Sequence, residues 1–275
     1  MSDTWHSPDE PEASAITAAG WLRMIWRGPA LVLVTFGGLV LLLILRLVER
    51  PLFGPKRPWT PYITQLVCRA DLIILGIRHE MRGDVAHGAG AVVANHSTGP
   101  DIFALHARSR VFFVAKSEVA SWPAIGWLAR AAGTVFFRRN ARDAEAHVSI
   151  ITQRLKTGQK LLFLPEGTST DGLQVIAFKS TLFAAFFNSE IDPDLLVQPV
   201  TVSYRAPSGE DARFYGWWGN MDLAAHLAKM LAARRHGSVT IICHAPLRVG
   251  DFGDRKSLAR ACEDAVRSGL PQLAL

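Results

Sequence analysis

The sequence predicts an α/β protein with a mainly parallel mixed sheet flanked by helices and an N-terminal membrane-anchoring helix or helical hairpin. Three observations predict it. A long uncharged apolar run lies near the start, short β-rich segments then alternate with helical ones, and polar clusters follow several of those strands. The 275 residues suit one large domain with an appendage. We divide them into a polar tail with a pre-anchor segment (1–27), an anchoring region (28–82) and an α/β domain (83–275).

The anchoring region begins with residues 28–45, which contain no ionisable side chain. As a helix they would extend about 27 Å, close to the hydrocarbon thickness of a bilayer. A fully buried core helix is the alternative. A second apolar stretch, residues 62–77, contains Arg69 and Asp71, so it is a weaker spanning candidate. A helical hairpin that enters one leaflet therefore stays open.

The flanking charges predict an orientation. The run is preceded by Arg23 and Arg27 and followed by four more basic residues, Arg46, Arg50, Lys56 and Arg57. The positive-inside rule then places the protein in the inner (cytoplasmic) membrane with the α/β domain in the cytoplasm. The net charge of +6 favours anionic surfaces. Because the basic residues are dispersed and form no recognition motif, we expect no nucleic-acid partner.

The remainder alternates between the two kinds of segment. Helical patterns cover residues 102–107, 144–156, 180–188, 222–234 and 255–268. Strands are expected at residues 91–94, 111–114, 134–137, 160–164, 196–202 and 238–243. In such sheets, reactive groups collect where strands end and helices begin.

The first polar cluster is Asn95-His96-Ser97-Thr98-Gly99-Pro100-Asp101, directly after a strand. Pro100 suits the first helical turn, where Asp101 gains from the helix dipole. A strand-to-helix corner can bring His96 and Asp101 within hydrogen-bonding reach. A neutral imidazole can take a proton from a hydroxyl, and a carboxylate on its other nitrogen fixes the tautomer. The spacing alone is a weak signal, and a structural histidine is the alternative. No G-x-S-x-G motif supplies a protein nucleophile, so direct attack by a substrate hydroxyl is favoured.

Two further clusters follow later strands. Arg138 and Arg139 end one of them, and a guanidinium there suits a phosphate or carboxylate, although a solvated strand end is the alternative. Glu166 and Gly167 open the run Pro165–Gly172, where glycine permits a sharp turn and the carboxylate could orient a cation or hydroxyl, although an ordinary polar loop would have the same composition. The remaining candidate substrate contacts are Thr168, Lys116 and Lys179.

The segment from Lys116 to Arg130 combines Trp122, Trp127 and flanking cations. It suits a patch resting on the bilayer interface, and a plain core helix is the alternative. The three cysteines are far apart and form no C-x-x-C pair, so we expect packed thiols, no metal site and a reducing compartment.

Four sequence blocks occur in the order NHxxxxD, G-x-x-F-x-x-R, P-E-G-T and Val197-Gln198-Pro199-Val200. In this order they resemble the glycerolipid acyltransferase family, which includes the 1-acylglycerol-3-phosphate O-acyltransferases. The resemblance covers about residues 90–205. It implies that His96 is the base and Asp101 its orienting partner, that Arg139, Glu166 and Gly167 bind substrate, and that residues 83–275 form the catalytic domain. It also implies an acyl thioester donor, on acyl carrier protein or coenzyme A, with no cofactor or metal.

Two blocks depart from the usual family pattern. Ser-Thr-Gly-Pro stands before Asp101 where many relatives carry bulkier residues, and Ser169 replaces an arginine that phosphate-recognising members carry. Residues 165–172, 178–187 and 214–222 look more like bacterial lyso-ornithine lipid O-acyltransferases, whose acceptor carries a carboxylate and amines in place of a phosphate. The implied function is acylation of a lysolipid hydroxyl, either lyso-ornithine lipid or 1-acylglycerol-3-phosphate, in membrane lipid biosynthesis. The alternatives are a non-catalytic, membrane-tethered lipid-binding protein on the same scaffold, and a hydrolase.

Overall fold

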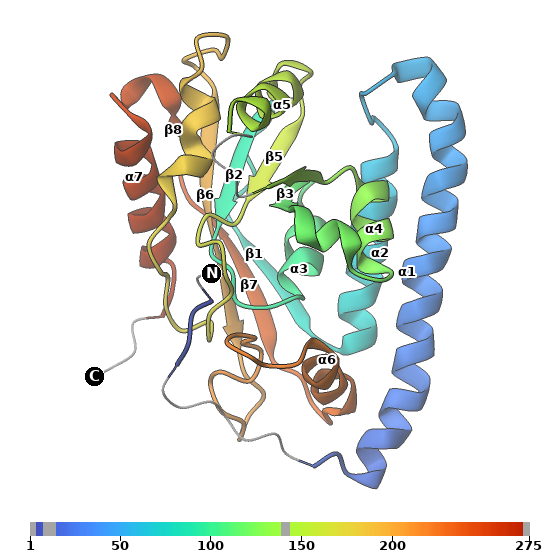
Figure 1. Cartoon of the computed structure of the whole chain (residues 1–275). Coiled ribbons are helices and arrows are strands. Elements are labelled where there is room, and N and C mark those ends of the chain that lie inside the picture. Colours follow the sequence, from blue (N-terminus) through green and yellow to red (C-terminus); the bar gives the residue numbers. More distant parts are fainter. Residues whose placement is uncertain (1–3, 8–14, 139–143, 272–275) are drawn as a thin grey trace.

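The fold is built on one mixed sheet (Figure 1). The computed structural model describes residues 4–7, 15–138 and 144–271. The strands run in the order β1-β7-β6-β2-β5-β3-β4, and β8 pairs with β6. The pairs from β6 through β2, β5 and β3 to β4 are parallel, whereas β7 and β8 run antiparallel to β6. The strands are β1 (Arg78–Arg82), β2 (Gly90–Ala94), β3 (Phe112–Lys116), β4 (Val135–Phe137), β5 (Lys160–Phe163), β6 (Leu196–Arg205), β7 (Ser238–Cys243) and β8 (Leu247–Arg248). The predicted α/β class with a mainly parallel mixed sheet is confirmed.

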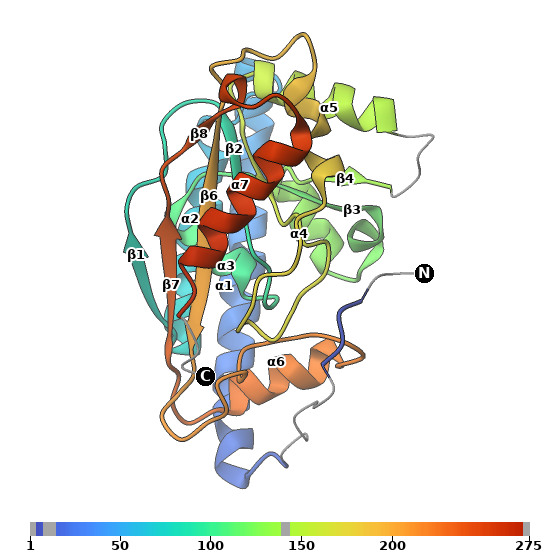
Figure 2. The ribbon, with the colours of Figure 1, turned by 90° about the vertical axis from the view of Figure 1, so that its left-hand side faces the viewer.

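Helices cover both faces of this sheet. The helical elements are α1 (Ala18–Phe53), α2 (Thr60–Leu75), α3 (Asp101–Arg108), η1 (Ser117–Ser121), α4 (Ile125–Ala132), α5 (Ala144–Lys156), η3 (Ser180–Phe187), α6 (Leu223–Ala232), η4 (Val249–Asp251) and α7 (Arg255–Ser268). Successive strand residues point to opposite faces, so Val93 joins the core with α7 and η3, while Val92 joins the core with α2 and α3. Figures 1 and 2 show α7 on one side of the sheet and the long helix α1 on the other.

The helices α1 and α2 form a hairpin against the domain. Within it, the Thr35 hydroxyl donates to Asp71 at 3.0 Å. The side chain of Val67 packs directly on the backbone of Gly38, where an added Cβ would lie 2.2 Å from it. From α2, the guanidinium of Arg69 donates to the carbonyl of Ala107 on α3 at 2.7 Å. The two charged residues that made α2 a weak spanning candidate therefore have protein partners.

Several elements differ from the sequence predictions. The helical segment predicted at residues 180–188 is a 3₁₀ helix from Ser180 to Phe187. The polar strand β1, with the sequence RHEMR, was missed because it is an edge strand with few apolar side chains to reveal its pairing with β7. The sheet therefore starts at Arg78, five residues before the boundary drawn at Gly83. The helix α1 extends beyond its apolar run in both directions, from Ala18 to Phe53, and so includes part of the segment 1–27 that we assigned to the polar tail and pre-anchor segment.

Candidate active site

Directly after the central strand β2, the side chain of Asn95 continues the hydrogen bonding between this strand and β6. The Asn95 amide donates to the carbonyl of Val202 at 2.9 Å and accepts from the Val202 amide at 2.8 Å. Because this side chain takes the place of a further backbone pair, the main chain is free to leave the sheet at His96. The histidine therefore lies at the carboxyl edge of the parallel strands.

His96 and Asp101 are brought together by the corner between β2 and α3. Asp101 is the first residue of α3 and fully buried. Its Oδ2 lies 2.8 Å from His96 Nδ1 and accepts from the backbone amides of Ser97 at 2.7 Å and Thr98 at 3.0 Å. A carboxylate can only accept, so Nδ1 carries the proton and Nε2 keeps a free lone pair. The His96 side chain is 21% exposed, so part of the imidazole ring is accessible.

A second loop holds the backbone of His96 from the other side. The His96 amide donates to Oε1 of Glu166 at 3.0 Å, and the His96 carbonyl accepts from the Thr170 amide at 3.0 Å. The second carboxylate oxygen of Glu166 lies 3.5 Å from the amide of Ile176. Glu166 is fully buried, and burial raises its pKa well above the ordinary value, with the neighbouring Asp101 adding to the rise. Its contacts are thus with the protein backbone.

The turn after Glu166 requires glycine at one position. Gly167 has a φ of 72°, in the left-handed region, and its amide donates to the carbonyl of Leu164 at 3.1 Å. Farther along the loop, Gly172 lies against Ser97, where a Cβ would come within 3.3 Å of the serine side chain. The loop can therefore approach the His96 corner closely only because this position lacks a side chain.

A third segment, residues 214–222, packs on the same corner. The Trp217 amide donates to the carbonyl of Ser97 at 2.9 Å. From α6, the imidazole of His226 lies 3.1 Å from the hydroxyl of Thr98. Both side chains are buried, and burial lowers the pKa of His226 to about 4. In the sequence this segment stands out only for its resemblance to known enzymes; its position next to Ser97 comes from the fold.

Tyr204 is a neighbour of Asp101 that the sequence did not reveal. Its hydroxyl and the Asp101 Oδ1 atom are both buried, and neither has a hydrogen bond of good geometry among the described residues. The pKa of Tyr204 is raised well above 10, first by burial and then by the Asp101 carboxylate that its hydroxyl faces. The phenol therefore stays neutral and can act as a donor toward Asp101.

Four other predicted site residues, Lys179, Lys116, Thr168 and Arg139, come from different parts of the chain. Lys179 is adjacent to the Glu166 turn, since its amide donates to the carbonyl of Pro165 at 2.9 Å. Lys116 ends β3, a parallel strand two positions from β2, and is half-buried. Thr168 is half-buried next to Gly167. Arg139 falls outside the described residues, while its neighbour Arg138 is exposed.

The cysteines are packed thiols. Cys68 and Cys262 are buried and Cys243 is half-buried. Burial raises the pKa of Cys262 to about 12 and that of Cys243 to about 11, which keeps both thiols protonated at neutral pH. Within residues 4–7, 15–138 and 144–271 there is no cluster of three histidines, cysteines or carboxylates that could hold a metal ion.

Comparison with known proteins identifies the family and the fold. Residues 77–203 match the protein family described as Acyltransferase. The chain is 54% identical over 268 residues to a lyso-ornithine lipid O-acyltransferase of Rhodobacter capsulatus, covering 98% of this chain and 97% of that protein. It is 39% identical over 179 residues to a 1-acyl-sn-glycerol-3-phosphate acyltransferase of Neisseria gonorrhoeae, covering 64% and 68%. The crystal structure of the 1-acyl-sn-glycerophosphate acyltransferase of Thermotoga maritima has the same fold, with a TM-score of 0.64, 19% identity and coverage of 91% and 94%.

Proposed function

The chain belongs to the glycerolipid acyltransferase family, and we propose that it transfers a fatty acyl chain from an acyl thioester to the hydroxyl of lyso-ornithine lipid. The enzyme class and the use of a lysolipid acceptor follow from the family. The choice of lyso-ornithine lipid is supported by the 54% identity over nearly the whole chain to an enzyme with that name. Ser169 points the same way, because it replaces a guanidinium that would bind a phosphate.

The observation that carries the proposed mechanism is the 2.8 Å contact between His96 Nδ1 and Asp101 Oδ2. His96 Nε2 takes the proton of the acceptor hydroxyl while that oxygen attacks the thioester carbonyl. The new ester bond forms as the carbon–sulfur bond breaks, and the imidazolium returns its proton to the leaving thiolate. Asp101 stabilises the imidazolium throughout.

Direct transfer, without an acyl-enzyme, is supported by the surroundings of His96. The hydroxyl of Ser97 belongs to a side chain that is 1% exposed, and that of Thr98 is buried against His226. Neither hydroxyl is placed to reach a substrate. The acceptor hydroxyl is then the nucleophile. The donor carrier, acyl carrier protein or coenzyme A, would deliver its thioester to the exposed side of His96, and the mechanism requires no cofactor or metal.

A direct assay tests this proposal. Purified enzyme is given lyso-ornithine lipid or 1-acylglycerol-3-phosphate, each with acyl carrier protein or coenzyme A thioesters, and products are identified by lipid mass spectrometry. We expect acylated lyso-ornithine lipid to dominate and His96→Ala to abolish its formation. Asp101→Asn should lower kcat by orders of magnitude while binding persists. Full activity in His96→Ala would refute the mechanism, free fatty acid as the product would indicate a hydrolase, and no product with any pair would favour a lipid-binding protein.

The chain associates with membranes, and we propose that its hairpin lies in one leaflet of the inner membrane with the catalytic domain in the cytoplasm. α1 packs against the domain at two separated places: Arg23 donates to the carbonyl of Ala232 on α6, and around Leu43 the helix packs against α4. Twenty residues of helix separate these contacts, about 30 Å, the thickness of the hydrocarbon core. A spanning α1 would pull α6 and α4 to opposite membrane faces. An in-plane helix avoids this.

The outer face of α1 suits such a position. Many of its large apolar side chains are more than half exposed, and such a surface is unusual for a soluble helix. They are Trp21, Leu22, Ile25, Trp26, Val32, Leu33, Val40, Leu41, Ile44, Leu47, Val48 and Leu52. The basic residues on both sides of the apolar run support this orientation, because the positive-inside rule favours the cytoplasmic side for both ends of the helix.

A further inference from the structure

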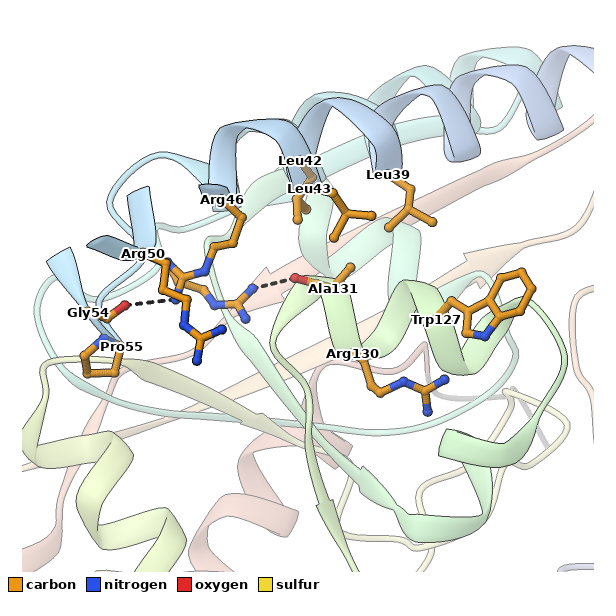
Figure 3. Close-up of a pocket in the computed structure, with 11 residues that line it drawn as sticks. Leu39, Leu42, Leu43, Arg46, Arg50, Gly54, Pro55, Trp127, Arg130 and Ala131 are labelled. Carbon is orange, nitrogen blue, oxygen red and sulfur yellow. Dashed lines mark hydrogen bonds between the residues drawn. The ribbon is translucent and has the colours of Figure 1, made fainter. Parts of the chain in front are cut away.

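A groove separate from the catalytic corner runs between the C-terminal half of α1 and α4 (Figure 3). It is open to solvent and has a volume of about 900 Å³, within the range of ligand pockets. Along α1 the lining passes from leucines to arginines, and α4 contributes both apolar and basic side chains. The lining residues are Leu39, Leu42, Leu43, Arg46, Arg50, Gly54, Pro55, Arg57, Trp127, Arg130 and Ala131.

The change in chemistry follows one face of α1. Leu39, Leu42, Leu43, Arg46 and Arg50 recur at intervals of one, three or four residues, which places them on a single helical stripe. The stripe is about 16 Å long at the rise of an α-helix. Its leucines belong to the uncharged run that enters the membrane, and its arginines follow that run. An apolar chain and a charged group joined end to end would match it.

The cationic end has far more positive than negative charge. Arg46 is paired with Glu49 at 3.0 Å. Among the described residues, Arg50, Arg57 and Arg130 make no salt bridge. Arg50 and Arg130 are exposed. Arg130 donates through Nη1 to the carbonyl of Ala120 at 2.7 Å, which leaves its other N–H groups for an anion.

Arg57 is held in a fixed position. Its guanidinium donates to the carbonyl of Ala131 and lies against Gly133, where a Cβ would come within 3.0 Å of its Cζ. Gly133 adopts the left-handed conformation that ends α4, with a φ of 87°, so glycine is favoured there on two grounds. Burial lowers the pKa of Arg57 to about 10, and the nearby Arg46 and Arg154 contribute to that decrease. A bound anion would relieve this repulsion.

The groove lies away from the reacting groups. Gly133, at the end of α4 beside the groove, lies against Phe112, the first residue of β3. The groove is therefore near the amino edge of the parallel strands. His96 and Glu166 follow the carboxyl ends of β2 and β5, the opposite edge.

We propose that this groove binds one anionic membrane lipid, with an acyl chain along the leucines and its negatively charged headgroup among the arginines. Charge complementarity favours an anionic over a zwitterionic lipid, and the continuous stripe on the membrane helix favours a lipid over an acidic protein. Trp127, 62% exposed at the rim, suits the headgroup level of a bilayer. The bound lipid would fix the height and tilt of the hairpin at the membrane surface, independently of the chemistry at His96.

Native mass spectrometry of the detergent-purified full chain tests this proposal. The probes are dioleoylphosphatidylglycerol and dioleoylphosphatidylcholine, titrated separately. We expect one phosphatidylglycerol per chain and much weaker phosphatidylcholine binding. Arg50→Gln/Arg130→Gln should weaken phosphatidylglycerol binding about 30-fold, since each basic residue near an anionic lipid contributes roughly 1 kcal/mol. Leu39→Trp, which fills the apolar end without changing charge, should weaken it as well.

The matched control is Arg255→Gln/Lys256→Gln, which removes two exposed charges from α7 on the other side of the sheet and should leave binding unchanged. Thermal unfolding verifies that each variant folds. Equal binding of both lipids, or unchanged binding in Arg50→Gln/Arg130→Gln, would overturn the proposal. Displacement of the lipid by millimolar inorganic phosphate would overturn it too and assign the arginines to free anions. A different result would assign the arginines to a protein partner. In that case the lipid-free enzyme would bind apo acyl carrier protein, the arginine double variant alone would lose this binding, and lipid binding would stay intact.

Discussion

The backbone amide of His96 donates to the buried carboxylate of Glu166 at 3.0 Å, although the two residues are 70 positions apart. Their strands, β2 and β5, are parallel neighbours, so both side chains leave the sheet at the same edge. This geometry makes Glu166 a positioning residue that holds the base by its main chain. Contact with the substrate is not required for it to affect catalysis.

Glu166→Gln should therefore lower kcat more than it raises KM. The amide oxygen can still accept from one backbone N–H, but its NH₂ group would face the other, leaving a buried donor unpaired at a cost of about 1–3 kcal/mol. We expect kcat to fall 10- to 100-fold and the KM for lysolipid to change less than threefold. Steady-state kinetics measure both. A large rise in KM with an unchanged kcat would show instead that Glu166 binds the acceptor.

Tyr204→Phe removes the hydroxyl that faces Asp101. Without this dipole the carboxylate charge is less compensated and holds the imidazolium more strongly, so the acid limb of the kcat/KM profile should move to higher pH. We expect a several-fold loss of kcat with little change in KM. A pH–rate profile in detergent measures both effects.

The control for Tyr204 is Tyr215→Phe. Its ring lies 5.0 Å from that of Tyr204, but its hydroxyl contacts His236 and the Gly237 amide, away from the reacting groups. This variant should lose stability and keep the wild-type pH profile. Identical profiles for Tyr204→Phe and the wild type would show that the Tyr204 hydroxyl does not influence the His–Asp pair.

Local pattern predicted that His96 and Asp101 could come within hydrogen-bonding reach, because a strand, an N-terminal helical turn and a five-residue spacing constrain one another. Their roles as base and orienting partner came from the family resemblance, since the spacing alone was a weak signal. The strand before Glu166 was predicted from local pattern as well. The strand Ser238–Cys243 and the helices 144–156 and 255–268 have the expected bounds, since their periodicity is uninterrupted.

The remaining site contacts depend on strand order, which no local pattern contains. Tyr204 reaches Asp101 because β6 lies beside β2, and His226 reaches Thr98 because α6 folds back over that corner. Both pairs are separated by more than 100 residues. The contact of Arg57 with the end of α4 likewise depends on the packing of α1 against α4. The sequence alone therefore showed Arg57 only as one of the basic residues that flank the apolar run.

The in-plane position of α1 predicts that both of its ends are accessible from one side of the membrane. Ala15 and Lys56 are exposed just beyond the first and last residues of the helix. Single cysteines at Ala15→Cys and Lys56→Cys, introduced one at a time, should both react with an impermeant maleimide in inside-out vesicles. Neither should react in intact spheroplasts. Cys68 and Cys262 are buried, and the wild type gives the background from Cys243. Labelling of the two positions from opposite sides would establish a spanning helix.

Acid should destabilise the fold through buried histidines, and His106 gives the clearest test. Its ring is buried 5.0 Å from that of Phe113, and burial lowers its pKa from 6.5 to about 4. Between pH 6.5 and pH 4, His106 therefore binds a proton in the unfolded chain but not in the folded chain. Stability from this group is fully present above pH 6.5 and is lost as the pH falls toward 4, by about 3 kcal/mol.

His106→Leu keeps an apolar side chain there and should flatten the dependence of the unfolding free energy on pH across this window. Urea unfolding in detergent from pH 4.5 to 7 measures it, with the exposed His87→Leu as the control. A slope as steep in His106→Leu as in the wild type would mean that other groups, such as His79, His226 and His236, carry the acid sensitivity.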